Sequence, residues 1–138
     1  MSEYYYRRRV QFAETDMAGI VHFSAYFRYM EEAEHALWRA AGLTVAPAGA
    51  EPGWPRVAAA FDYKAPLRFG DEFDVWVQIV KVSARTIQYG YTLKREGTVI
   101  GHGLMTAACV MLDPEGVMKA VEIPAGILDR LRGAITGG

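Results

Sequence analysis

The pattern of apolar and polar positions changes from strand-like to helical near residue 24. Residues 4–12 alternate partly, which favours a β-strand. One face of that strand would carry four residues: Tyr6, Arg8, Val10 and Phe12. Farther along, apolar positions recur every three or four residues, at Tyr26, Met30, Ala33, Leu37 and Ala41. This stripe predicts one long helix, with Ser24 as its N-cap and Gly42 just after its end.

Most of the remaining chain has period two and predicts β-strands. The four main runs lie at residues 57–63, 73–79, 87–93 and 98–112. Their connectors are short, which favours antiparallel neighbours, because a parallel pair needs a crossover of about a dozen residues. A short strand is expected at 117–123, and Pro124 is expected to open a brief helix that runs to about Arg132 before a frayed tail. Residues 43–55, with three prolines and two glycines, predict an irregular loop.

These elements predict an α+β domain in which one long helix covers a sheet. A helix is about 10–12 Å wide and strands lie about 4.8 Å apart, so a sheet of five or six strands must curl around the helix to be covered. Its edge strands stay exposed unless another subunit pairs with them. We therefore expect a homodimer with a continuous sheet, and further pairing into a dimer of dimers.

Composition favours one globular domain, residues 1–138, and narrows the classes of partner. The chain is 51% hydrophobic and 22% charged, and its formal net charge of -1 gives no basic field for nucleic acid or an anionic membrane. The single cysteine, Cys109, excludes an internal disulfide and is expected to be a small buried hydrophobe. The N-terminal segment lacks the apolar core of a signal peptide, and no apolar run reaches about 18 residues, so we expect a cytoplasmic protein with no membrane span.

The segment before the helix carries the candidate chemistry. Residues 7–33, RRRVQFAETDMAGIVHFSAYFRYMEEA, contain the step D-M-A-G-I-V at residues 16–21. This segment resembles the signature of the 4-hydroxybenzoyl-CoA thioesterase family of hotdog-fold proteins, where a strand ends in D-x-[AG]-G-[IV]-V before the central helix. The element order is similar over nearly the whole chain, and the YbgC-like acyl-CoA thioesterases are also similar. The resemblance implies a hotdog fold, a curved antiparallel sheet wrapped around one long central helix, and acyl-CoA hydrolysis.

The resemblance also implies roles for two groups. Asp16 would act as nucleophile or as general base for water, and the Phe23 backbone amide would donate to the carbonyl oxygen. Amides at a helix N-terminus suit a developing oxyanion, and a thiolate leaves without a strong general acid. On spacing alone, however, a cap or turn role is favoured for Asp16, and only the resemblance reverses this preference. Glu14 points to the other side of the strand end and is expected to be structural.

Other candidate residues have weaker support. A triad of Asp16, His22 and Ser24 is disfavoured, because three residues in one turn rarely converge in the required geometry. The YbgC-like proteins carry histidine one position later, so His22 is expected at most to line the pocket. Tyr26 matches a recurrent tyrosine of the family but also lies on the apolar stripe, where core packing is the competing role.

Arg85 and Thr86 form a basic-then-hydroxyl pair that recurs in similar proteins, and Arg85 is the best candidate for the coenzyme A phosphates. The alternative for Arg85 is a solvated turn residue. No metal site and no redox cofactor are expected. The acyl group stays open between aromatic and aliphatic, although several aromatic residues are available to line an aryl pocket: Trp54, Tyr63, Trp76, Tyr89 and Tyr91.

Two alternatives to an acyl-CoA thioesterase follow from the same sequence. The first is a polyketide-type thioesterase that acts on an acyl-carrier protein, but similar enzymes of that class carry asparagine at the position of Asp16. The second is a non-catalytic acyl-CoA-binding protein, which would bind the thioester without releasing thiol.

Overall fold

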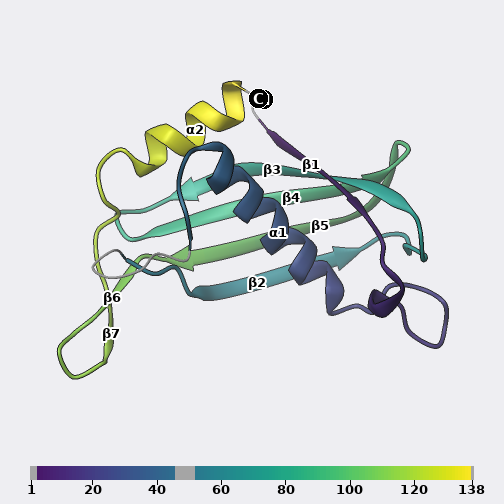
Figure 1. Cartoon of the computed structure of the whole chain (residues 1–138), viewed down its shortest axis with the longest axis horizontal. Coiled ribbons are helices and arrows are strands. Elements are labelled where there is room, and N and C mark those ends of the chain that lie inside the picture. Colours follow the sequence, from purple (N-terminus) through teal and green to yellow (C-terminus); the bar gives the residue numbers. More distant parts are fainter. Residues whose placement is uncertain (1–2, 46–51, 138) are drawn as a thin grey trace.

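The computed structural model describes residues 3–45 and 52–137 and contains one main sheet with two helices. The elements are, in chain order, β1 (Tyr4–Arg9), the 3-10 turn η1 (Phe12–Glu14), α1 (Ala25–Ala40), β2 (Arg56–Tyr63), β3 (Glu72–Val82), β4 (Thr86–Arg95), β5 (Thr98–Ala108), β6 (Val110–Leu112), β7 (Met118–Ala120) and α2 (Ile127–Gly137). Five strands form an antiparallel sheet in the order β1-β3-β4-β5-β2, and β6 and β7 form a separate hairpin. Helix α1 lies across one face of the curved sheet (Figure 1). The predicted hotdog arrangement is confirmed.

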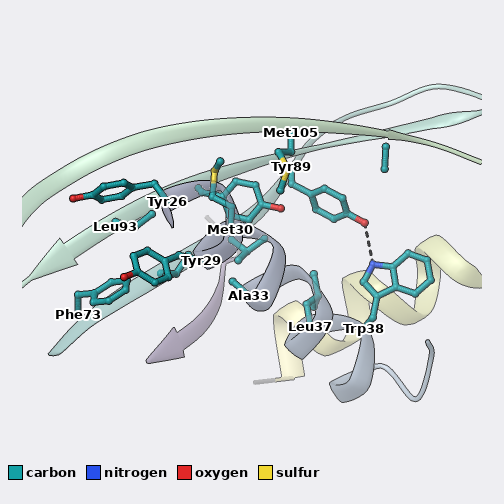
Figure 2. Packing of buried hydrophobic residues seen from close by; sticks show 14 of the residues in the cluster. Tyr26, Tyr29, Met30, Ala33, Leu37, Trp38, Phe73, Tyr89, Leu93 and Met105 are labelled. Atoms are coloured by element: carbon teal, nitrogen blue, oxygen red, sulfur yellow. Dashed lines mark hydrogen bonds between the residues drawn. The ribbon is translucent and has the colours of Figure 1, made fainter. Parts of the chain in front are cut away.

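The core lies between α1 and the inner face of the sheet. The predicted apolar stripe is buried from Tyr26 to Leu37, whereas Ala41 lies just after α1 and is half-buried. The aromatic, Met and Leu side chains of the stripe pack against Phe73, Tyr89, Leu93 and Met105 of the sheet (Figure 2). Gly103 in β5 faces the helix, and a Cβ there would overlap the sulfur of Met30. A larger residue here would force the fully buried Met30 side chain to move, so glycine suits this close approach of helix and sheet. Cys109 is fully buried, as predicted, and burial raises the pKa of its thiol.

The connector between β2 and β3, residues 64–71, crosses the end of the sheet. Strand β2 pairs with β5 at one edge, whereas β3 pairs with β1 near the other edge. The prediction that these consecutive strands are neighbours is wrong, because eight extended residues reach about 26 Å and easily span the roughly 14 Å of three strand spacings. Leu67 is fully buried in this connector, and its carbonyl accepts the Val21 N–H at 2.8 Å. The crossing thus brings residues 64–66 beside the start of α1.

Several boundaries differ from the sequence prediction. β1 ends at Arg9, and Phe12 lies in η1 with its side chain 75% exposed instead of continuing the strand face. The turn forms because the Gln11 N–H donates to the Glu14 carboxylate at 2.8 Å and the Glu14 N–H donates to the Gln11 carbonyl at 3.0 Å. Ser24 is the N-cap residue of α1, as predicted, but its side chain makes no capping hydrogen bond.

The C-terminal half also departs from the prediction in two places. The run at 98–112 divides into β5 and β6 at Cys109. Helix α2 begins at Ile127, not at Pro124, and continues to Gly137, because Leu131 and Ile135 are buried one turn apart and hold it on the core. Residues 46–51 of the predicted loop lie outside the described residues. Within residues 3–45 and 52–137, neither helix is both long and apolar enough to cross a membrane.

Candidate active site

Residues 15–21 form a tight loop that presents Asp16 in front of α1. Thr15 and Val21 pair as an antiparallel bridge, and the Asp16 N–H donates to the Ile20 carbonyl at 2.9 Å. Gly19 has φ of 82°, a left-handed conformation that favours glycine. The Asp16 Oδ1 atom accepts the Ala18 N–H at 2.9 Å. Asp16 is therefore a turn residue, yet its side chain is exposed, and its Oδ2 atom has no hydrogen-bond partner among the described residues.

Glu14 anchors this loop from behind. Its carboxylate accepts hydrogen bonds from the Arg8 guanidinium, from the Gln11 N–H at 2.8 Å and from the Tyr29 hydroxyl at 2.9 Å. Its carbonyl accepts the His22 N–H at 2.8 Å. Burial by itself raises the pKa of Glu14, but the hydrogen bonds from Arg8, Gln11 and Tyr29 outweigh it and hold the pKa below its ordinary value. Glu14 is thus an ionised structural residue, in agreement with the sequence prediction.

The peptide between His22 and Phe23 carries the candidate oxyanion donor. Its carbonyl accepts the Ala25 N–H at 2.9 Å, at the first turn of α1. In a trans peptide the N–H points opposite to the carbonyl, so the Phe23 N–H points away from the helix. Within residues 3–45 and 52–137, no acceptor receives this N–H. A free donor at a helix N-terminus is suited to stabilise negative charge on a ligand oxygen.

Asp16 and Phe23 line the same hollow. It has a volume of about 390 Å³, in the range of small-molecule sites. The lining residues come from the Asp16 loop, α1, β2 and the crossing connector: Asp16, Ile20, Val21, Phe23, Tyr26, Tyr63, Lys64, Ala65 and Pro66. The rings of Tyr26 and Tyr63 meet edge to face with centroids 5.2 Å apart. The residues that line the hollow therefore include one with a carboxylate, one with a free backbone N–H, and aromatic side chains.

A second hollow of about 550 Å³ lies on the other side of Asp16. Its lining includes the exposed apolar side chains of Phe12, Met17 and Phe69. Asp16 thus stands between two hollows and is open to both. In the part of the chain that the structure describes, no group of three or more His, Cys, Asp or Glu side chains is placed to hold a metal ion.

The structure separates the candidates that lie close together in sequence. The Nδ1 atom of His22 lies 2.8 Å from the Ser24 Oγ, and the His22 ring stacks on Phe23 with centroids 4.5 Å apart. His22 does not line the hollow, and the hydrogen bonds of the described residues do not connect it to Asp16. The Asp16, His22 and Ser24 side chains thus form no triad. Tyr26 is buried, as its place on the apolar stripe predicted, and also reaches the hollow wall.

Arg85 and Thr86 do not meet Asp16 within one chain. Thr86 pairs with Ala108 in β5, beside the Arg56 end of β2, whereas the hollow lies at the Tyr63 end. Seven residues of strand separate these ends, a distance of roughly 23 Å at about 3.3 Å per residue. Conversely, Lys64 lines the hollow, and nothing in the sequence ranked it above Arg68 or Lys94 as a cation for the substrate, because the crossing of the β2–β3 connector was not predicted.

A family model described as the Thioesterase-like superfamily matches residues 10–131. The chain belongs to this superfamily. The thioesterase-like chain is 36% identical over 129 residues to a protein from Aquifex aeolicus that carries a provisional esterase name, with 92% of this chain and 96% of the relative covered.

Solved structures extend the likeness of this thioesterase-like protein. A 1,4-dihydroxy-2-naphthoyl-CoA thioesterase from Synechocystis superimposes with a TM-score of 0.83 at 25% identity, covering 97% of this chain and 96% of the other. A gentisyl-coenzyme A thioesterase superimposes with a TM-score of 0.82 at 26% identity, covering 93% of this chain and 99% of the other. The thioesterase-like protein is accordingly a thioester hydrolase with the hotdog fold.

Proposed function

We propose that this protein hydrolyses an aroyl-CoA thioester to the free acid and coenzyme A, with Asp16 as the reacting carboxylate. One observation carries the proposal: one hollow at the N-terminus of α1 is lined both by Asp16, whose carboxylate has one oxygen without a hydrogen-bond partner among the described residues, and by Phe23, whose N–H has no acceptor among them. The similarity to thioesterases named for 1,4-dihydroxy-2-naphthoyl-CoA and gentisyl-CoA supports a coenzyme A thioester as substrate. The aromatic walls formed by Phe23, Tyr26 and Tyr63 favour an aromatic acyl group over an aliphatic one.

The chemistry needs only these two groups. The thioester carbonyl oxygen accepts the Phe23 N–H, which stabilises the negative charge that develops during attack. Asp16 then acts in one of two ways. As nucleophile, its oxygen forms a bond to the carbonyl carbon, the C–S bond breaks, the thiolate leaves with the electron pair, and water cleaves the resulting anhydride. As general base, Asp16 takes a proton from water while the water oxygen attacks the carbon and the thiolate leaves.

We also propose that the working unit is a homodimer joined through β2. This edge strand exposes Val57 and the three alanines that follow, and an exposed apolar edge favours pairing with another strand. A two-fold axis through the middle of β2 pairs Tyr63 with the partner subunit's Arg56. That pairing brings the partner subunit's Arg85 and Thr86 toward the hollow, where Arg85 is suited to the coenzyme A phosphates. A dimer of dimers, a cytoplasmic location and the lack of a cofactor stay predictions.

The substitution Asp16→Asn tests the role of the carboxylate. Asparagine keeps the oxygen that accepts the Ala18 N–H, so the loop and the circular dichroism spectrum should not change. We expect kcat for 4-hydroxybenzoyl-CoA or 1,4-dihydroxy-2-naphthoyl-CoA, whichever is hydrolysed faster, to fall by at least about 100-fold. Asp129→Asn, on the exposed face of α2, is the matched control and should retain activity. A fully active Asp16→Asn variant would exclude the proposed role.

The alternatives are separated by the choice of substrate. A free-thiol assay on benzoyl-CoA, 4-hydroxybenzoyl-CoA, 1,4-dihydroxy-2-naphthoyl-CoA, hexanoyl-CoA and palmitoyl-CoA measures kcat/KM for each acyl group. The same acyl groups on an acyl-carrier protein test the polyketide-type alternative. Binding of every thioester without release of thiol would instead indicate the non-catalytic alternative.

A further inference from the structure

A tyrosine from another element holds the turn that carries the candidate oxyanion donor. The Tyr63 hydroxyl donates to the Phe23 carbonyl at 2.8 Å, although the two residues are 40 positions apart. Tyr63 is the last residue of β2, and its ring also lines the hollow. Among the described residues, this is the one hydrogen bond that Phe23 receives from outside its own turn.

We propose that Tyr63 is a positioning residue for hydrolysis: its hydroxyl fixes the peptide that follows Phe23 and thereby aims the Phe23 N–H into the hollow. The proposal rests on the proposed function. Two peptide planes meet at the Phe23 Cα, and their directions set its φ and ψ. The preceding plane is held by the bond from the Ala25 N–H to the His22 carbonyl, and the following plane is held by Tyr63.

Packing of the Phe23 side chain does not replace this bond. The side chain is 64% exposed, and its one ring contact among the described residues is with His22, which belongs to the same turn. Without the Tyr63 hydroxyl, the Phe23–Ser24 peptide can rotate, and the plane that carries the Phe23 N–H is then held only by the bond from the Ala25 N–H to the His22 carbonyl. A donor that must reorient during the reaction stabilises the oxyanion less well than a preorganised one.

Tyr63 is itself firmly placed. Its ring meets Phe61 at 4.8 Å and Tyr26 at 5.2 Å between centroids. The next two residues are fixed as well, because the Lys64 and Ala65 N–H groups both donate to the Ile100 carbonyl. Partial burial raises the pKa of Tyr63, so its hydroxyl stays protonated and able to donate through neutral pH. The sheet thus supports the turn through a rigid side chain.

The substitution Tyr63→Phe removes the hydroxyl and keeps the ring in the wall. We expect kcat for the best aroyl-CoA substrate to fall by about 10- to 100-fold with KM within about threefold, because aligning a donor matters most in the transition state. Affinity for a trifluoromethyl ketone analogue of that substrate, which forms a tetrahedral oxyanion, should fall in parallel with kcat. Affinity for S-benzyl-CoA, which has no carbonyl, should not change. Tyr5→Phe, equally exposed on the outer face of β1, is the matched control.

Two results would overturn the positioning role. One is a kcat within twofold of the native value. The other is an equal loss of affinity for the trifluoromethyl ketone and for S-benzyl-CoA, which would show that Tyr63 only lines the hollow. The ¹⁵N relaxation of the Phe23 amide gives a readout that needs no turnover: Tyr63→Phe should increase its mobility, and an unchanged amide would refute the proposal. Failure of the proposed function is distinct, since it appears as full activity of Asp16→Asn or as no thiol release by the native protein.

Discussion

Replacing Glu14 with glutamine tests the ion network behind the Asp16 loop. The side chains of Arg8 and Glu14 are only 13% and 16% exposed, and Arg8 also bonds Glu32 at 2.7 Å. Glutamine has nearly the same shape and keeps one oxygen for the Gln11 N–H and the Tyr29 hydroxyl. It loses the negative charge, and its amide nitrogen faces the Arg8 guanidinium, which is also a donor.

The expected cost follows from the bonds that are lost. A hydrogen bond to a charged group contributes about 1.5–3 kcal/mol. Glu14 accepts two hydrogen bonds from Arg8; glutamine loses the one at Oε2 and keeps the one at Oε1 without its negative charge. Arg8 keeps its bonds to Glu32, so the guanidinium is not left unpaired. We therefore expect Glu14→Gln to lower the free energy of unfolding by about 2–3 kcal/mol at pH 7. Glu31→Gln, on the exposed face of α1, should cost less than about 1 kcal/mol.

Urea unfolding at fixed protein concentration measures this difference between pH 7 and pH 3. The folded pKa of Glu14 lies below its unfolded value, so the contribution of the carboxylate is fully present above the unfolded pKa and is lost as pH falls through the folded pKa. Glutamine does not titrate. The stability gap between native protein and Glu14→Gln should therefore be constant near pH 7 and shrink below about pH 4. A gap that is absent at pH 7, or the same at every pH, would refute this reasoning.

Three further changes address the core and the assembly. Arg56→Met leaves the fully buried Glu34 carboxylate without its ion-pair partner and should lower the free energy of unfolding in urea by about 3–5 kcal/mol. Adding Glu34→Leu should recover most of this loss, and an unchanged stability of the single variant would contradict the pairing. Gly101→Ala places a methyl group against the Phe61 ring and should cost about 1–3 kcal/mol; a neutral result in thermal unfolding would show that the strands can separate there. Arg85→Ala should raise KM for aroyl-CoA. Mixing the Arg85→Ala protein with the Asp16→Asn protein should restore activity at low substrate concentration, because a mixed dimer contains one complete site. A mixture without recovered activity would contradict the β2 dimer.

Predictions about residues that lie close together in the sequence were more accurate than predictions that depend on residues far apart in it. The step from Asp16 to the start of α1 was predictable because the candidate groups lie within eight residues and the helical stripe marks where the helix begins. The position of Tyr63 beside Phe23 could not be predicted, because it depends on the β2–β3 connector crossing three strand spacings. A connector of eight residues fits a hairpin loop between neighbouring strands as well. The end of β1 was missed for a local reason: the bond between the Gln11 N–H and the Glu14 carboxylate competes with strand continuation.

The two oxygens of Asp16 explain why its sequence context suggested both a turn residue and a catalytic one. Oδ1 accepts the Ala18 N–H and fixes the loop, and a residue that forms such a turn is common before a helix. That bond orients the carboxylate plane and leaves Oδ2 without a partner among the described residues, in a side chain that lines the same hollow as Phe23. Structural use of one oxygen therefore orients the other for reaction. Asparagine preserves the first property and lacks the second, and for this reason Asp16→Asn separates the structural contribution of this side chain from its proposed chemical one.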